Sequence, residues 1–392
     1  MRVLVVHNKY SSRVPSGENL AVSDEVGWLR EAGVDVHLHE ADNDDAFAAG
    51  KAERARQAVR GAWSRPAGRA MERRLHEVAP DLVHVHNVFP LLTASVVRAA
   101  TAAGLPVVWT AHNHRVTCVE GGNFRDGAIC TDCRPGWRVP GIRHGCYAGS
   151  TAASTVVTAG TALFRRLAHR RLTTLAISEH MRGWLVDEAG FPPDRVRVKY
   201  NGVAGPAAGT TTTPADESRT FLFVGRLDRH KGIGLLLDAW ARTKDGIDAQ
   251  LHLLGDGGMA PEVEAAAAGD PRITWFGAVP PSEVAKHLAT ARAVVAPATW
   301  EEPFGRVAAE ALAHRRGLIA TRRGGLAEIV DPSFGWVVDP EPAALAAALV
   351  DAARPDADLA TRTRAGHERY ERRFSPEATT TALVEIYREV TR

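Results

Sequence analysis

Two carboxylates eight positions apart enclose a stretch that could bind a phosphorylated ligand. Glu302 lies in a polar loop after an apolar run, and Glu310 lies two turns inside the helical pattern that follows. Between them, the amides of Phe304, Gly305 and Arg306 open the predicted helix, where N–H groups lack intrahelical partners and the macrodipole is positive. Eight helical residues span roughly 12 Å at about 1.5 Å each. That is about the reach from the sugar to the ribose of a nucleoside-diphosphate sugar.

A second stretch, F-V-G-R-L-D-R-H-K-G at residues 223–232, places Arg226 and Lys231 in one loop between a predicted strand and a predicted helix. Arg226 can bond a phosphate in bidentate fashion, and Lys231 can act as a point charge. The pair therefore suits the two phosphates of a departing nucleoside diphosphate. The plainer alternative is a solvated basic loop.

These two patterns, Glu302-x7-Glu310 around Phe304-Gly305 and G-R-L-x-x-x-K-G, resemble the signature of retaining glycosyltransferase family 4. The resemblance covers nearly the whole chain and is strongest over residues 221–330. It implies an α/β fold of GT-B architecture, in which two Rossmann-like doubly wound domains face each other across a cleft. It also implies retaining hexosyl transfer from a nucleotide sugar, such as a UDP-sugar, with no cofactor or divalent metal for catalysis.

The resemblance also implies roles for single residues. Arg226, Lys231 and the helix start at 304–306 would stabilise charge on the leaving phosphate, Glu302 would hold sugar hydroxyls and Glu310 the ribose hydroxyls. His112, just past a predicted strand in T-A-H-N-H, would contact the sugar from the opposite domain. For an isolated histidine, a structural role would be the simpler interpretation.

Four glycines match donor-contacting turns of the resembled family. Gly17 stands in P-S-G-E-N, where the family often has two glycines, and is expected to touch the diphosphate. Gly324 and Gly325 open R-R-G-G-L-A-E-I-V and are expected to supply backbone amides. Gly277, after Phe276, is expected to line the base pocket without revealing which base is bound.

The composition is that of a globular protein with two or three domains. The 392 residues are 45% hydrophobic and 24% charged, and no window approaches eighteen consecutive apolar residues. The N-terminal apolar run is too short for a signal sequence, which predicts a buried first strand and a cytoplasmic protein. Net charge is +2, with the excess of basic residues in the first half. That balance excludes a typical nucleic-acid binder but allows an anionic acceptor or a weak membrane-surface contact there.

Short apolar runs alternate with helical patterns twice along the chain, which predicts two parallel sheets. We expect an acceptor-binding domain at 1–204, a linker at 205–219, a nucleotide-sugar domain at 220–375 and a helix at 376–392 that packs back on the first domain. The stretch Lys51–Arg74 is expected to form a solvated helix pair rather than a membrane surface. The expected strands are residues 3–7, 34–39, 82–86, 106–111, 174–177, 196–198, 221–224, 250–254, 273–276, 293–296, 317–320 and 335–338.

All four cysteines lie in one loop, residues 115–147, which has no regular periodicity and adjoins His112. Its spacing is C-x11-C-x2-C-x12-C, and a loop of this length needs a staple. In a cytosolic chain we expect structural Zn²⁺ held by four thiolates, while two disulfides or free thiols remain alternatives. The ligands would be Cys118, Cys130, Cys133 and Cys146.

Three other functions share parts of this pattern. A nucleotide-sugar epimerase could use the same fold and diphosphate site without a second substrate. A glycosidase could use two carboxylates, although clustered cations and helix amides suit a diphosphate better than a neutral glycan. A non-catalytic sugar-nucleotide-binding partner would be expected to lack some of these groups. A sugar-containing or polyol acceptor is the second substrate that we expect.

Overall fold

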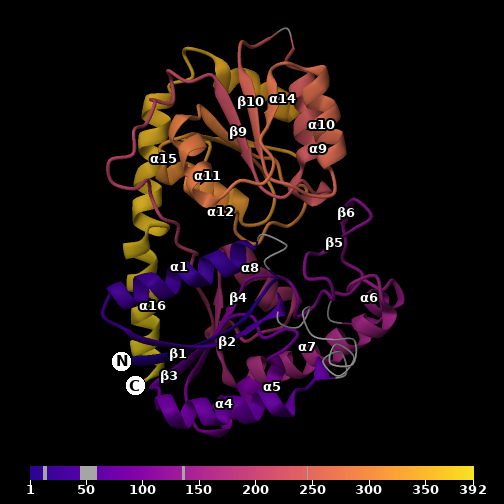
Figure 1. Ribbon diagram of the computed structural model, residues 1–392, viewed down its shortest axis with the longest axis vertical. Coiled ribbons are helices and arrows are strands. Elements are labelled where there is room, and N and C mark those ends of the chain that lie inside the picture. The colour runs from indigo at the N-terminus through magenta and orange to yellow at the C-terminus, as the bar shows by residue number, and fades with distance from the viewer. Residues whose placement is uncertain (12–15, 45–59, 135–136, 245) are drawn as a thin grey trace. The chain divides into compact units, whose positions relative to one another are not determined.

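The computed structural model describes residues 1–11, 16–44, 60–134, 137–244 and 246–392. Contacts within these residues divide the chain into two compact units, each with one six-stranded parallel sheet between helices (Figure 1). The α/β class with two doubly wound domains is thereby confirmed. The first unit comprises Met1–Asn123, Cys130–Tyr200 and Thr379–Arg392, and the second Phe124–Ile129 and Asn201–Ala378.

The first sheet has the strand order β2-β1-β3-β4-β7-β8, with every pair parallel. Helices α4, α5 and α7 pack against one another on one side of it, and α1 lies on the other (Figure 1). Its elements are β1 Arg2–Lys9, α1 Gly17–Glu31, β2 Asp35–Asp42, α4 Arg65–Val78, β3 Leu82–Val85, α5 Thr93–Ala102, β4 Val107–Ala111, α6 Val139–Arg143, α7 Thr151–Arg171, β7 Thr173–Ala176, α8 Glu179–Gly183, a π-helical turn Trp184–Glu188, a 3₁₀ turn Pro193–Arg195 and β8 Val196–Val198.

The second sheet has the strand order β11-β10-β9-β12-β13-β14, again with every pair parallel. One face carries a core that includes Phe221, Leu236, Trp240 and Leu349, contributed by strands and by α9 and α14. Its elements are β9 Thr220–Val224, a 3₁₀ turn Arg229–Lys231, α9 Ile233–Ala241, β10 Gln250–Leu254, α10 Ala260–Gly269, β11 Ile273–Trp275, α11 Pro281–Thr290, β12 Ala293–Ala296, α12 Arg306–Ala313, β13 Gly317–Thr321, α13 Leu326–Ile329, β14 Trp336–Val338, α14 Pro342–Ala353 and α15 Leu359–Arg373.

The last helix, α16 (Pro376–Val390), gives its C-terminal part to the core of the first unit. Leu383 and Tyr387 pack there with Val3 and Val5 of β1. The Tyr387 hydroxyl lies 2.6 Å from Nδ1 of His84, which is fully buried on β3. Because a buried hydroxyl needs a partner, this bond fixes how α16 sits on the sheet.

The cysteine-rich loop contains a β-hairpin that the sequence analysis did not predict. Strands β5 (Phe124–Arg125) and β6 (Ala128–Ile129) pair in antiparallel fashion. The two turn residues, Asp126 and Gly127, both have positive φ, 55° and 82°. That conformation suits an Asp-Gly hairpin turn, because Asp tolerates and Gly favours left-handed backbone. The Asp126-Gly127 dipeptide was the sequence signal from which this hairpin could have been predicted.

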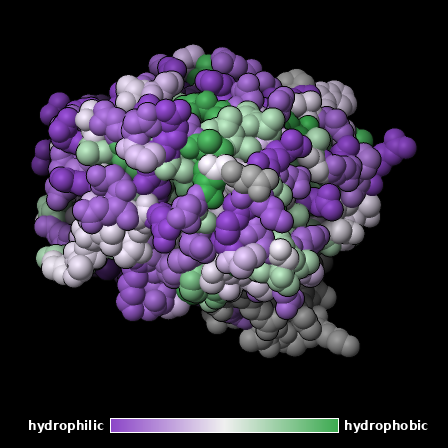
Figure 2. Space-filling view, turned by 90° about the horizontal axis from the view of Figure 1, so that it is seen from above, coloured by the Kyte–Doolittle hydropathy of each residue, from purple (hydrophilic) through white to green (hydrophobic). Residues whose placement is uncertain are grey.

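The exposed surface of the described residues is mainly hydrophilic on the face drawn in Figure 2, with hydrophobic residues gathered in small patches. None of the described helices has the length and hydropathy needed to cross a bilayer. Of the stretch Lys51–Arg74, residues 51–59 lie outside the described residues, while Arg65–Val78 form the single helix α4.

Candidate active site

The second unit places its two predicted phosphate-binding loops side by side. Strands β9 and β12 are neighbours at the point where the strand order reverses, and ligands of such sheets bind beyond the carboxyl ends of the strands there. The two loops are joined by a bond from the Thr299 amide to the His230 carbonyl, 3.0 Å. Gly232 has φ +77°, and a Cβ there would lie 1.8 Å from the Pro297 carbonyl oxygen. Only glycine permits this approach of the loops.

Lys231 and Glu302 meet at this junction. The Lys231 ammonium lies 2.7 Å from Glu302 Oε2 and 5.0 Å from the centre of the Trp300 ring. The Trp300 indole donates a hydrogen bond to the same carboxylate oxygen at 2.9 Å. Both charged side chains remain partly exposed, so they can exchange this contact for a ligand's phosphate and hydroxyl groups. Trp300 was missed, although an aromatic residue two positions before Glu302 was a visible signal.

The helix after β12 begins later than the sequence suggested. Gly305 is its N-cap with φ +95°, and α12 starts at Arg306, so Glu310 lies about one turn inside it, not two. No side chain caps this helix start, and the Ala308 and Ala309 amides donate to the Gly305 carbonyl at 3.0 and 3.4 Å. The positive end of the helix dipole at this start suits an anion. Arg306 Nε lies 2.8 Å from Glu310 Oε1. Phe304 precedes the cap, and its ring is buried against Phe374.

The two glycines of the G-G turn pack against the Glu302 loop. Gly324 has φ +53°, and a Cβ there would lie 2.3 Å from the Glu302 carbonyl oxygen. The Gly325 amide donates to that oxygen at 2.6 Å. The Gly325 amide is therefore used inside the protein, whereas we had expected it to face the diphosphate. These glycines position the loop that carries Glu302.

Arg226 projects from the β9 loop and is tied to its neighbours. Its guanidinium lies 3.2 Å from Asp228 and donates to His230 Nε2 at 3.0 Å. Burial, with the nearby charges of Lys231 and Arg226, lowers the pKa of His230 to about 4. His230 is therefore neutral at pH 7 and adds no charge, so Arg226, Arg229 and Lys231 carry the positive charge of this loop.

The wall predicted for the base lies at the ends of β10 and β11. Gly277 has φ +70°, and its carbonyl accepts the Gly255 amide at 2.7 Å. The neighbouring Phe276 ring is unusually exposed for a large apolar side chain, 40%, and meets the His287 ring edge-on, 4.5 Å between centroids. An exposed aromatic face suits base stacking, and the base pocket at Gly277 stays a prediction.

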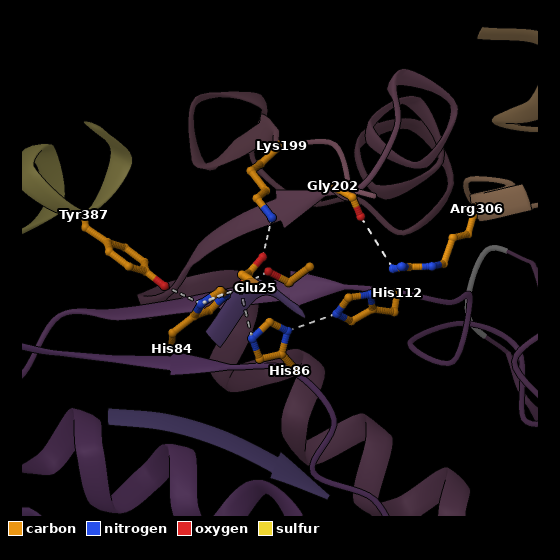
Figure 3. A network of polar contacts seen from close by, with 9 residues as sticks. Glu25, His84, His86, His112, Lys199, Gly202, Arg306 and Tyr387 are labelled. Carbon is orange, nitrogen blue, oxygen red and sulfur yellow. Dashed lines mark hydrogen bonds and ion pairs between the residues drawn. The ribbon is translucent and has the colours of Figure 1, made fainter. Parts of the chain in front are cut away.

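In the first unit, His112 ends a chain of buried polar contacts (Figure 3). Lys199 forms an ion pair with Glu25, whose other oxygen lies 3.4 Å from His86 Nε2. His86 Nδ1 lies 3.0 Å from His112 Nε2. The contact between His86 Nε2 and Glu25 is an ion-pair distance rather than a hydrogen bond, but a carboxylate can only accept, so it favours a proton on His86 Nε2. In that tautomer His86 Nδ1 accepts from His112 Nε2, and His112 Nδ1 carries a lone pair.

Charge in this network is concentrated on one ion pair. Burial and the neighbouring His86 lower the pKa of His112 well below its usual range, so it is neutral at pH 7. Burial alone would raise the pKa of Glu25, but Lys199, His86 and His84 together hold it well below its usual value. Glu25 and Lys199 were missed because 174 positions separate them.

The loops after β1 and β4 bring a further carboxylate near His112. Gly17 opens α1, whose N-cap Ser16 accepts the Asn19 amide at 3.3 Å. Glu18 lies 3.3 Å from Nδ2 of Asn113, the residue after His112, and lines the same hollow as His112. Desolvation, opposed by Arg115, raises the pKa of Glu18 to about 7. A carboxyl group with this pKa can accept or donate a proton near neutrality, so Glu18 joins the candidate residues.

The four cysteines of residues 115–147 are free and partly buried, so no disulfide joins them. Burial raises the pKa of the Cys133 thiol, with smaller contributions from Cys118, Cys130 and Cys146, so the four are near one another. The Gly121 amide donates to Cys118 Sγ at 3.4 Å. Among the described residues, the group whose potential metal-ligand atoms lie within 4.8 Å of one another is not the cysteines. It is Glu25, His84 and His86. Zinc binding by the thiols stays a prediction.

The two doubly wound units define a GT-B-type protein. Residues 19–204 match the family model described as Glycosyltransferase Family 4, and residues 218–354 match the one described as Glycosyl transferases group 1. Together these matches cover more than half of the chain. The chain belongs to glycosyltransferase family 4.

Known proteins resemble the chain along its full length. Alpha-maltose-1-phosphate synthase of Mycolicibacterium smegmatis is 27% identical, with 100% of each chain aligned. D-inositol 3-phosphate glycosyltransferase of an Arthrobacter species is 35% identical over 34% of each chain. Among solved structures, HepE of Anabaena in complex with UDP and glucose has a TM-score of 0.70 at 18% identity, covering 99% of this chain and 100% of HepE. Sucrose-phosphate synthase of Thermosynechococcus elongatus has a TM-score of 0.68 at 19% identity, covering 99% and 98%. These two structures share the fold.

Proposed function

We propose that this protein is a retaining glycosyltransferase that moves a hexosyl unit from a nucleoside-diphosphate sugar to a hydroxyl of a glycan, lipid-linked or small-molecule acceptor. The observation that carries the proposal is the junction of Lys231, Glu302 and the uncapped start of α12 at the switch point of the second sheet. Cations and helix amides meet there beside a carboxylate, which is the donor set that a diphosphate joined to a sugar requires.

The roles follow from the charges. Lys231, Arg226 and the amides at the start of α12 stabilise the negative charge that grows on the leaving phosphate, by preorganised electrostatics. Glu302 holds donor-sugar hydroxyls, and Glu310 holds the ribose hydroxyls after giving up its contact with Arg306. With no side-chain nucleophile assigned, a leaving-phosphate oxygen takes the acceptor proton.

His112 contributes a hydrogen-bond acceptor in this scheme. Its Nε2 proton points to His86, so its neutral Nδ1 accepts from a sugar hydroxyl. Glu25 and Lys199 act only through His86 and are positioning residues. The names of the relatives guide the choice of substrates: UDP-glucose is the first donor to test, because HepE was crystallised with it, and sugar phosphates belong in the acceptor panel.

Retention is tested by the anomeric configuration of a trapped product. Purified protein is incubated with an α-linked UDP-, GDP- or ADP-sugar and an acceptor panel that includes glycerol at high concentration, and the product is examined by ¹H NMR. We expect an α-glycoside, the configuration of the donor. A β-glycoside would overturn retention, and an altered sugar nucleotide without transfer would favour the epimerase alternative.

A further inference from the structure

A basic hollow lies on the first unit, and none of the residues assigned above lines it. Its volume is about 430 Å³, and α7 supplies most of its wall. Helix α6 packs against α7 beside it (Figure 1). The proposed glycosyl transfer assigns no role to this surface. The residues that line the hollow are Arg138, Thr158, Ala162, Arg165, Arg166, His169 and Arg170.

The positive charge of this hollow has no acidic counterpart within the described part of the chain. No carboxylate there forms an ion pair with Arg138, Arg165, Arg166 or Arg170. Arg138 is 95% buried and bonds neutral oxygens, Thr161 Oγ1 at 2.7 Å and the Thr158 carbonyl at 3.1 Å. Its Nε has no hydrogen-bond partner among the described residues. Arg138 also donates to the Val116 carbonyl, so its bonding partners are all neutral oxygens. An external anion would stabilise a buried guanidinium of this kind beside three further arginines.

Helix-end stabilisation explains only part of this charge. Cations in the last turn of α7, His169, Arg170 and Arg171, interact favourably with the helix dipole. Arg165 and Arg166 lie one turn earlier, where that effect fades, and Arg138 comes from a different segment. Burial, with Arg165 nearby, lowers the pKa of Arg138 only to about 10, so it stays protonated at neutral pH.

Exposed apolar side chains accompany the arginines. Trp137 and Val139 flank Arg138 in the chain and are the most exposed large apolar residues described, 77% and 61%. Leu163, on α7 next to Ala162, is also exposed. A soluble domain rarely exposes tryptophan to this extent, and tryptophan beside arginine is the composition that sits at a membrane interface.

We propose that this surface, Trp137–Val139 with the α7 positions Leu163, Arg166 and Arg170, docks on an anionic lipid bilayer. The arginines contact lipid phosphates, and the buried Arg138 guanidinium is the innermost anion-binding group. Trp137, Val139 and Leu163 enter the interfacial region without crossing the bilayer. Charge complementarity and the exposed apolar groups together select this occupant. A free phosphate offers these groups no apolar surface, and the aliphatic Val139 and Leu163 cannot stack on nucleobases.

Vesicle co-sedimentation of the full chain tests the proposal. Vesicles of phosphatidylcholine alone and of phosphatidylcholine with 30 mol% phosphatidylglycerol are compared at 50 and 500 mM NaCl. We expect binding to the anionic vesicles at low salt and at least tenfold weaker binding to neutral ones. The double variant Arg166→Glu/Arg170→Glu should lose at least tenfold, because two attractions become repulsions. Trp137→Ser should weaken binding severalfold at both salt concentrations.

The matched control is Arg364→Glu/Arg372→Glu on α15, which changes the net charge equally at two exposed positions. It should bind like the wild type. Thermal unfolding shows whether each variant is folded, and all substituted positions are exposed. Three outcomes would overturn the proposal. They are an equal loss of vesicle binding in both double variants, equal binding of the wild type to neutral and anionic vesicles, and binding to heparin but to no vesicle.

Discussion

Replacing Lys231 by methionine is expected to lower kcat/KM for the nucleotide-sugar donor by about 10²- to 10³-fold, the usual effect of losing one preorganised charge at a reacting centre. Methionine keeps the apolar stem beside Trp300 but removes the ammonium that lies 2.7 Å from Glu302. The leaving phosphate then loses a cation, and Glu302 loses its counter-ion. Release of nucleoside diphosphate at several donor concentrations measures the effect.

Lys286→Met is the matched control, because Lys286 is an exposed lysine of α11 in a surface ion pair with Glu283. Its kcat/KM should stay within about twofold of the wild type, since such pairs contribute little. A loss below threefold in Lys231→Met, in a protein that unfolds at the wild-type temperature, would contradict the role assigned to Lys231.

The second large effect is on stability. Lys199→Met is expected to reduce the free energy of unfolding by about 3–5 kcal/mol, because it leaves the Glu25 carboxylate buried without its cation. Chemical denaturation at pH 7.5 measures this. Arg197→Met, two residues earlier on β8, removes an exposed ion pair with Glu389 and should cost less than about 1 kcal/mol.

The pH dependence gives a sharper test of the same pair. In the wild type, the pKa of Glu25 is depressed, so its stabilising contribution is present above its unfolded pKa of about 4.5 and is lost as the pH falls through the folded value. In Lys199→Met, Glu25 can fold protonated. The stability gap should therefore be widest near pH 7 and shrink toward pH 4. A gap that is independent of pH would show that packing, not charge, explains the loss.

Much of the fold could be predicted from local patterns. All twelve predicted strands are present, because each buried parallel strand is a short apolar run between turn residues, as in Ala293–Ala296. The hairpin β5–β6 was missed, since two-residue strands carry no periodicity. The start of α12 was placed too early: Gly305 takes a left-handed conformation outside the helix, so α12 begins at Arg306, and composition does not reveal that choice.

Residues of the candidate site could be predicted where a local sequence motif marks the loop that carries them. Lys231 and Glu302 were both expected from their loops, and the structure brings them together 71 positions apart. Lys199 was not, because a contact across 174 positions creates its role. Trp300 was overlooked, although it stands two positions before Glu302. Gly324 and Gly325 were predicted as donors of backbone amides to the diphosphate, but the structure gives them a packing role. Gly324 and Gly325 are required because another loop packs against them at distances that a Cβ would not permit.

Donor binding is the most direct test of the central claim that the second unit holds a nucleoside-diphosphate sugar. Thermal unfolding and nucleoside-diphosphate release are measured without acceptor for a panel of UDP-, GDP- and ADP-sugars, with the wild type and Glu310→Ala. We predict that one donor raises the unfolding temperature and is slowly hydrolysed, and that Glu310→Ala loses both responses. An unfolding temperature that no sugar nucleotide changes would contradict the donor site.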